Sequence, residues 1–345
     1  MNLWAWIILI AAALAVFPMA VRAVMSAALQ RFDPQWLLGN VASPDQLALR
    51  RHIVTTFLHG MAMSLRVGWA DSSLDKVIEN TSTYEKAFLV EGCCAGLAMA
   101  YSLTPWRSVS SLDRFRGKYE QFEFLNVIGL GFGAGLARLL HLRFVSPDAF
   151  VSKNLRTLWA DGFGFQHTIF LYRKGKGVPA IIRAADALPY EGYFEGVGRA
   201  LWFLLHSAEF LPTLIEDFPA SVVSELVTGY GIAAGFAGCR QLARSFAEAS
   251  QFPLTLAAHY KVGMLVGLFA RSYVDSAAFN SLLHEQGYET ILPLITTAAN
   301  FYHAGLSRGE EYSIWRSSLL EIVASPLLGH NIQTAWPPQP TLVEG

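Results

Sequence analysis

Apolar residues recur at intervals of three and four along most of the chain, from residue 45 to about residue 325. This spacing places them on one face of successive α-helices. Prolines with neighbouring turn residues interrupt the pattern, and a helix is expected to end or begin at each of them. The breaks are Thr104-Pro105, Ser146-Pro147-Asp148, Leu211-Pro212 and Phe252-Pro253. The pattern predicts a mainly α-helical fold.

One stretch departs from the helical spacing. Residues Thr168 to Tyr172 and Val178 to Ile182 are rich in β-branched and aromatic side chains, and Gly175-Lys176-Gly177 lies between them. Two such runs around a glycine-containing turn are typical of a β-hairpin. A small hairpin is therefore expected within the helical fold.

The chain begins with an apolar segment long enough to cross a membrane. Leu3 to Val21 contains no charged residue, and as a helix it would span roughly 28 Å. Trp4 and Trp6 are placed to meet one membrane interface and Arg22 the other. We interpret residues 1–22 as a transmembrane anchor in contact with membrane lipid. The alternatives are a cleaved signal peptide, which would need basic residues before Arg22, and a buried amphipathic start.

The positions of the cations predict the orientation of this anchor. Arg22, Arg31, Arg50 and Arg51 all follow the apolar segment, which by the positive-inside rule leaves the bulk of the chain in the cytoplasm. Every later apolar run is interrupted by a charged residue or histidine within about 15 residues, so a single-pass topology is expected. Residues 23–50 form an amphipathic connector, 51–330 the helical domain, and the proline-rich 331–345 a flexible tail.

Two sets of landmarks recur along the chain. Glu91-Gly92 recurs as Glu195-Gly196, with a leucine five residues after each glycine, and His59-Gly60 resembles a third copy. The run of small residues at 129–137 resembles a second run at 229–237, 100 residues later. Repetition in the same order predicts a duplicated helical-repeat domain, with halves at about 51–150 and 151–330. The glycines predict that helices cross at close range.

Composition limits the possible functions. Lys and Arg number 26 against 27 Asp and Glu, so no basic surplus exists for binding nucleic acid. Hydrophobic residues reach 53%, and charged residues only 15% against a typical value of about 25%. This excess predicts a large core, an apolar pocket, or a surface for lipid or a partner. The nine histidines form no zinc motif, so no metal is expected, although a site assembled from distant residues stays open.

Ionisable residues within apolar, glycine-rich sequence are the candidate site. They are expected to be partly buried, which requires partners. The candidates for acid–base catalysis are His59, Glu91, Asp161 and Glu195, and those for substrate binding are His167, Arg199 and His259. If the halves meet about a twofold axis, equivalent carboxylates converge on one pocket. The alternative is structural, with Glu91 and Glu195 in first helical turns and paired with cations such as Arg199.

Seven segments between about residues 50 and 325 together resemble a known family. They are Phe57 to Gly60, Phe88 to Trp106, Gly129 to Leu139, Asp161 to Phe165, Tyr193 to Phe203, Gly229 to Cys239 and Tyr312 to Arg316. In this order they resemble a bacterial family of unknown function associated with enediyne polyketide biosynthesis gene clusters. The chain departs from that family at Gln166-His167, where the family has a His-Glu step, and in its N-terminal anchor.

The resemblance implies an accessory role in natural-product biosynthesis, with no assigned catalytic residues and no known cofactor. It also implies partners, namely a multi-span membrane protein related to vitamin-K-dependent carboxylases and a β-propeller protein. Two functions follow as expectations. One is an enzyme or enzyme subunit that acts on an apolar polyene or polyketide-derived substrate at the membrane. The other is a non-catalytic helical scaffold for a multi-span membrane enzyme.

Overall fold

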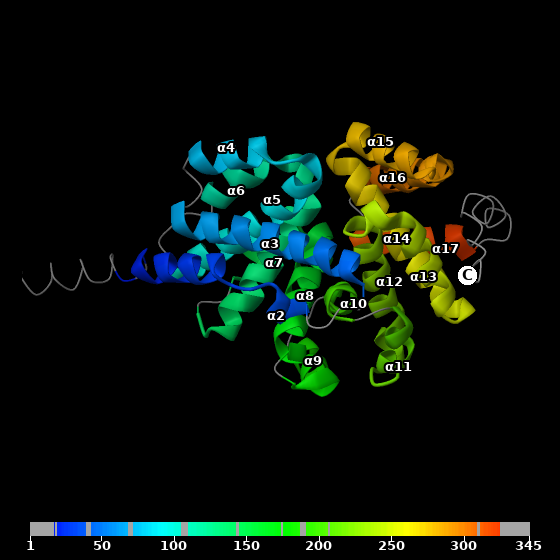
Figure 1. The fold of residues 1–345 in the computed structure, drawn as a ribbon, viewed down its shortest axis with the longest axis horizontal. Coiled ribbons are helices and arrows are strands. Elements are labelled where there is room, and N and C mark those ends of the chain that lie inside the picture. The colour runs from blue at the N-terminus through cyan, green and yellow to red at the C-terminus, as the bar shows by residue number, and fades with distance from the viewer. Residues whose placement is uncertain are drawn as a thin grey trace, which may run out of the picture.

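The computed structural model describes residues 17, 19–38, 43–67, 72–104, 110–142, 145–173, 175–186, 191–205, 208–308 and 311–324. These residues are mainly helical, as predicted, and contain no β-strand. A helix at Met19–Gln30 precedes the labelled elements of Figure 1. The others are α2 (Gln35–Leu38), α3 (Pro44–Val67), α4 (Ser72–Asn80), α5 (Thr83–Leu103), α6 (Ser110–Lys118), α7 (Glu123–Leu139), α8 (Arg156–Arg173), α9 (Gly177–Ala185), α10 (Tyr193–Leu204), α11 (Leu211–Ile215), α12 (Ala220–Phe236), α13 (Leu242–Glu248), α14 (Leu254–Val274), α15 (Ser276–Gln286), α16 (Leu292–Ser307) and α17 (Tyr312–Ala324).

The predicted β-hairpin is wrong. Thr168 to Tyr172 belong to α8, and Val178 to Ile182 belong to α9. Gly175 and Gly177 have φ of 67° and 63°, and they turn the chain between the two helices rather than between two strands. Val178 and Ile181 are buried one helical turn apart. Burial of that helical face therefore outweighs the β preference of the branched side chains.

Seven helices form the centre of the molecule, and each packs against the next in the order α3, α5, α7, α8, α10, α12, α14. Glycines lie at every crossing of this series. A Cβ on Gly92 would collide with the Phe57 carbonyl oxygen, and one on Gly131 with the Trp159 carbonyl oxygen. Neighbouring backbones therefore approach more closely than any side chain would allow, which compensates for the low helix propensity of glycine.

The glycine contacts recur in the second half of the series. Gly92 faces the Phe57 carbonyl where α5 crosses α3, and Gly196 faces the Asp161 carbonyl where α10 crosses α8. Further along, Gly129 faces the Glu91 carbonyl, as Gly229 faces the Glu195 carbonyl. Gly60 pairs with the Leu89 carbonyl and Gly164 with the Tyr193 carbonyl. In this pattern Gly60 therefore matches Gly164 on α8, rather than Gly92.

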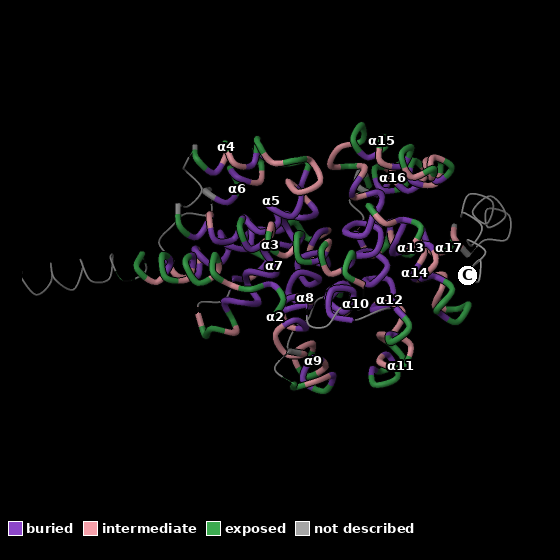
Figure 2. The backbone as a smooth tube through the Cα atoms, viewed as in Figure 1, coloured by how far each residue is buried: buried purple, intermediate pink, exposed green. Residues whose placement is uncertain are grey.

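Each end of the series also contacts a helix that is not its neighbour in the order. Arg271 on α14 donates to the Tyr84 carbonyl at the start of α5 across 3.1 Å, and Arg50 on α3 donates to the Leu205 carbonyl after α10 across 2.7 Å. Shorter helices lie outside this centre, with α4 and α6 at one end and α9 and α11 below it in Figure 1. Figure 2 shows buried residues concentrated along the seven helices and exposed residues on the outer ones.

Two helical segments among the described residues are long and apolar enough to cross a membrane, Thr83–Leu103 and Glu120–Leu139, and the bent pair Ala220–Phe236 with Cys239–Gln251 would add a third. The expectation that no later segment would qualify is therefore wrong. In each of the first two helices, 83% of the most apolar stretch of 18 residues is buried inside the fold. Their apolar character thus also serves the protein core. The predicted anchor lies largely outside the described residues, and the predicted tail lies wholly outside them.

The helix Met19–Gln30 continues the apolar N-terminal run and packs on α3. Arg22 is only 1% exposed and donates from Nε to the Leu65 carbonyl across 2.9 Å. The Arg22 side chain therefore holds this helix against the end of α3, and its place at a membrane interface stays a prediction. The connector boundary drawn at residue 50 falls inside α3, which begins at Pro44.

Candidate functional site

A largely apolar cavity lies between the seven central helices. It contains about 990 Å³ of empty space, including the part open to solvent. Every helix of the series contributes to its wall, and so do α2 and α17. The apolar lining includes Phe57, Phe88, Ile128, Phe165 and Phe269. A mostly apolar wall with a few placed polar groups is typical of small-molecule binding sites.

Three charged residues line this cavity among the described residues, namely Glu91, Asp161 and Arg199. Arg199 on α10 lies between the two carboxylates. Its Nη1 is 2.7 Å from Oδ1 of Asp161 on α8, and its Nη2 is 3.5 Å from Oε1 of Glu91 on α5. All three side chains are buried. The guanidinium carbon also lies 5.2 Å from the centre of the Phe165 ring, so an aromatic face contacts the cation.

Burial dominates the protonation of Asp161. Desolvation raises the pKa of its carboxyl from the ordinary 3.8 to about 7, although Arg199 opposes this shift. The residue can therefore hold or release a proton near neutral pH. A carboxyl with such a pKa, placed on the wall of an apolar cavity, is suited to general acid or base catalysis.

Glu195 does not join this group, although its counterpart Glu91 does. It is fully buried on α10 and forms an ion pair with Arg316 of α17. It is absent from the cavity lining. The two Glu-Gly helices therefore contribute one carboxylate to the cavity rather than two. The structure pairs Glu91 with Arg199, as in the structural interpretation, and also places both at the cavity wall. Glu195 lies in the first turn of α10, whereas Glu91 lies in the interior of α5, so its predicted place in a first helical turn is wrong.

None of the three candidate histidines lines the cavity. His59 is exposed on α3, so the expectation that it would be partly buried is wrong. Its helix turns this side chain outward while Phe57 and Leu58 line the cavity. His167 is partly buried on α8, with Nδ1 3.2 Å from the Tyr193 hydroxyl, and burial lowers its pKa to about 4. His259, partly buried on α14, also has a pKa lowered by burial.

The last described helix, α17, also lines the cavity, and none of the candidate residues predicted from the sequence lies on it. Tyr312 and Trp315 line the cavity, and Arg316 pairs with Glu195. Trp315 also donates from its ring nitrogen to the Ala298 carbonyl of α16 across 3.1 Å. The sequence signal was the segment Tyr312 to Arg316, which the family resemblance included but which no local motif marks as a site.

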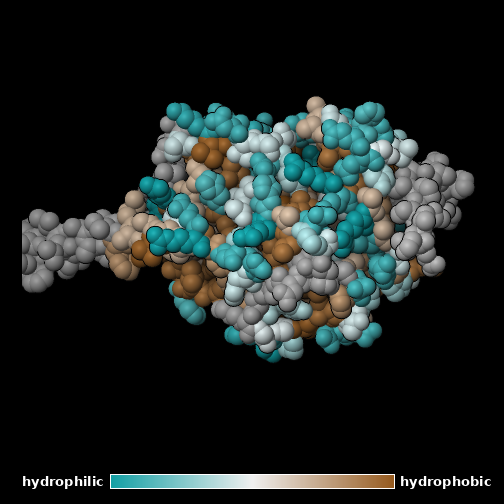
Figure 3. All heavy atoms as spheres, viewed as in Figure 1, coloured by the Kyte–Doolittle hydropathy of each residue, from teal (hydrophilic) through white to brown (hydrophobic). Residues whose placement is uncertain are grey.

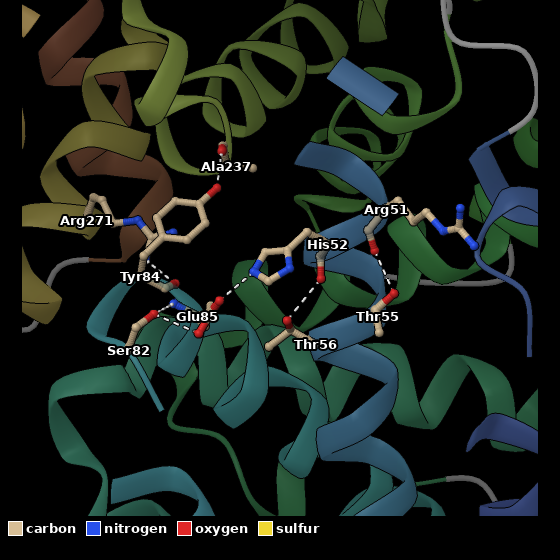
Figure 4. A network of polar contacts seen from close by, with 9 residues as sticks. All are labelled: Arg51, His52, Thr55, Thr56, Ser82, Tyr84, Glu85, Ala237 and Arg271. Carbon is tan, nitrogen blue, oxygen red and sulfur yellow. Dashed lines mark hydrogen bonds and ion pairs between the residues drawn. The ribbon is translucent and has the colours of Figure 1, made fainter. Parts of the chain in front are cut away.

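A polar network lies where α5 begins (Figure 4). The Tyr84 hydroxyl donates to the carbonyl of Ala237, a lining residue, across 2.7 Å. The Arg271 guanidinium lies 4.4 Å from the Tyr84 ring centre. Nearer the surface, His52 of α3 is 2.6 Å from Glu85, which follows the helix-capping residue Ser82. These contacts hold α3, α5, α12 and α14 together around the cavity.

No group of three or more His, Cys, Asp or Glu side chains within the described residues is arranged to hold a metal ion. The three cysteines, Cys93, Cys94 and Cys239, are buried and form no disulfide. The ionisable residues that line the cavity among the described residues are Glu91, Asp161, Arg199 and Tyr312.

Comparison with known proteins identifies the family but no activity. No curated protein and no solved structure matches the chain. A family model described as a protein of unknown function, DUF1702, matches residues 40–278, which is more than half of the chain. The match includes the helices that provide Glu91, Asp161 and Arg199. The chain therefore belongs to the DUF1702 family.

Proposed function

We propose that this protein binds an elongated, uncharged, apolar molecule in its central cavity and that Asp161 exchanges a proton with it. The observation that carries this proposal is the group of Glu91, Asp161 and Arg199 in an otherwise apolar wall. An ion group in such a wall costs desolvation energy that an apolar replacement would avoid. A role in positioning or protonating a ligand accounts for its presence there.

The charges of this group predict the class of ligand. With both carboxyls ionised, the two carboxylates and one guanidinium carry one net negative charge, and with Asp161 protonated they are neutral. Neither state attracts an anion. Arg199 also directs Nη1 and Nη2 to carboxylates already. A free fatty acid is therefore a poor ligand, whereas an uncharged polyene or polyketide-derived chain suits the aromatic and aliphatic wall.

The setting of this activity follows from the family resemblance. We propose that the protein is an accessory component of a biosynthetic pathway of the enediyne polyketide type, that its N-terminal segment anchors it in the membrane, and that the helical domain arose by duplication. The recurring glycine contacts support the duplication. Proton transfer by Asp161 would suit the isomerisation or cyclisation of conjugated double bonds, in which one C–H bond forms and another breaks.

Ligand counting tests the binding proposal. The uncharged polyene diphenylhexatriene and the anionic polyene parinarate would each be added to the full-length protein in detergent. Native mass spectrometry would then count the molecules bound per chain. We expect one diphenylhexatriene per chain and at least tenfold weaker binding of parinarate. Equal binding of the two, or none of the uncharged polyene, would contradict the proposal.

Two matched variants locate the binding site. Ala270 lines the cavity, so Ala270→Phe should fill part of it and reduce the bound polyene at least tenfold. Ala277 is exposed on α15, and Ala277→Phe should bind as the parent does. If both variants bind normally, the ligand occupies another place.

The alternative function is a scaffold for a multi-span membrane enzyme, and the exposed apolar face of the helix Met19–Gln30 favours it. A scaffold would keep its biological activity in the variants Glu91→Gln and Asp161→Asn. Comparison of the metabolites of cells that carry each variant would decide between the two functions. Loss of product with an unchanged melting temperature would support the enzyme.

A further inference from the structure

The helix Met19–Gln30 has one polar face and one apolar face, and the polar face is buried. Arg22 and Ser26 donate to the Leu65 and Ala62 carbonyls of α3, across 2.9 and 2.7 Å. Both side chains are at most 2% exposed. Up to Leu29, the helix therefore buries its polar side chains against α3 and exposes its apolar side.

The outward face has no polar side chain among described residues 17 and 19–29. Its exposed members are Phe17, Met19, Ala20, Ala23, Val24, Ala27 and Ala28. Val24 is 69% exposed and Met19 48%. Figure 3 shows this region as tan and brown surface, at the left of the view beside the grey N-terminal segment. A helix face of this length without a polar group is unsuited to water.

The sequence indicates what covers this face. The helix directly continues the uncharged run Leu3 to Val21, and the first exposed charge after it is Arg31. Trp36 follows at 48% exposure, and its ring centre lies 5.7 Å from that of Phe32. An apolar run that ends in an exposed cation and an aromatic residue is typical of a membrane surface.

The same region is also a wall of the cavity. Leu37, the residue after the exposed Trp36, is 8% exposed and lines the cavity, together with Val54 and Phe57 of α3. At α2, a single short helix therefore separates the exterior from the cavity.

We infer that the outward face of Met19–Gln30, with Trp36, lies in the surface of a lipid bilayer, and that α2 is the route by which an apolar ligand passes between the bilayer and the cavity. The bilayer contact does not depend on the proposed binding of an apolar ligand in the cavity, whereas the route rests on that part of the proposed function. An apolar ligand would then reach its site without crossing water.

A fluorescent probe tests the bilayer contact. Val24→Cys in the full-length protein would be labelled with nitrobenzoxadiazole and reconstituted in phosphatidylcholine vesicles with and without doxyl-labelled lipid. The three native cysteines are buried and should remain unlabelled in the folded protein. Leu254→Cys, at the 93% exposed start of α14, is the matched control. We expect at least twofold quenching by doxyl lipid at position 24 and none at 254.

Two results would overturn the contact. One is equal quenching at positions 24 and 254. The other is a probe at position 24 that is shielded from water, is not quenched by doxyl lipid, and becomes exposed to water when the protein is diluted. That result would show that a second copy of the chain covers the face.

The rate of cavity filling tests the route. Vesicles loaded with diphenylhexatriene would be mixed with vesicles that contain the protein, and bound polyene would be counted over time by native mass spectrometry. Trp36→Glu should slow filling at least fivefold and leave the final occupancy unchanged. Trp36→Gln should slow it less, and it is the uncharged substitute if the glutamate variant unfolds. Phe301→Glu, at a 43% exposed site on α16, should fill at the parental rate.

The outcomes separate the route from the proposed function. Parental filling rates in both Trp36 variants would overturn the route alone. If the parent takes up no diphenylhexatriene under any condition, the proposed function fails, whereas the bilayer contact is still decided by the quenching experiment.

Discussion

Arg199 on α10 lies 2.7 Å from Asp161 on α8, and the pair forms part of the cavity wall. The two helices are held at this distance by glycine contacts, since Gly196 faces the Asp161 carbonyl and Gly164 faces the Tyr193 carbonyl. The close backbone crossing thus lets a guanidinium reach a carboxylate inside an apolar interior. Four predictions follow from this arrangement and its neighbours.

Removal of Arg199 should destabilise the protein strongly. Arg199→Met leaves Glu91 and Asp161 buried without their cation, and breaking a buried ion group in this way costs about 3–5 kcal/mol. The free energy of unfolding in urea at pH 7 would measure the loss. Arg66→Met is the control, because Arg66 is exposed near the end of α3 and should change stability by less than about 0.5 kcal/mol. A similar small change for Arg199→Met would show that the ion group does not stabilise the fold.

The raised pKa of Asp161 predicts a specific dependence of stability on pH. The folded protein retains this proton up to about pH 7, whereas the unfolded chain releases it near pH 4. The stabilising contribution is therefore fully present below about pH 4 and is lost as the pH rises toward 7, with a slope of about 1.4 kcal/mol per pH unit. Above pH 7 the contribution should no longer change.

Comparison with Asp161→Asn isolates this effect, because asparagine does not titrate. The stability difference between parent and variant should change steadily between pH 5 and 7 and then level off. Urea unfolding at half-unit pH intervals would measure it. A difference that is constant over this range would show that Asp161 is ionised throughout.

Gly196→Ala should separate α10 from α8. A Cβ at this position would collide with the Asp161 carbonyl oxygen, and overpacking of this kind costs about 1–3 kcal/mol, occasionally more. Gly117→Ala is the matched control, because the structure shows nothing within 4 Å of a Cβ there and alanine is the better helix former. Thermal unfolding followed by circular dichroism should therefore show a lower Tm for the first variant and an equal or higher Tm for the second. Equal Tm values would show that the two helices can move apart without cost.

Glu195 and Arg316 should be coupled in a double-mutant cycle. Arg316→Met leaves Glu195 buried and unpaired, at a cost of about 3–5 kcal/mol, whereas Glu195→Gln combined with Arg316→Met should recover most of that loss. Urea unfolding of the parent, both single variants and the double variant would give the coupling. Simple additivity of the two single effects would mean that the ion pair does not hold α17 in place.

Local sequence determined the helices and many of the residues that are buried. The intervals of three and four predicted the helical fold, and the repeated glycines predicted close crossings, because both depend on residues near one another in the chain. Glu91, Asp161 and Arg199 were found as ionisable residues in apolar sequence, because such groups require partners wherever they are buried. The predicted hairpin was wrong because it relied on the β preference of branched side chains. Burying Val178 and Ile181 on one helical face stabilises the helix more than that preference favours a strand.

Only the tertiary structure decided which groups meet. Glu91 and Glu195 share the Glu-Gly pair and the leucine five residues after the glycine, yet one lies on the cavity wall and the other pairs with Arg316, over 100 residues away. His59 likewise shares the apolar context of Glu91 and is exposed. The helical period defines the face on which a side chain lies, whereas the partner of that face depends on how distant helices cross. That crossing is set by backbone contacts between segments far apart in the chain, which no local pattern contains.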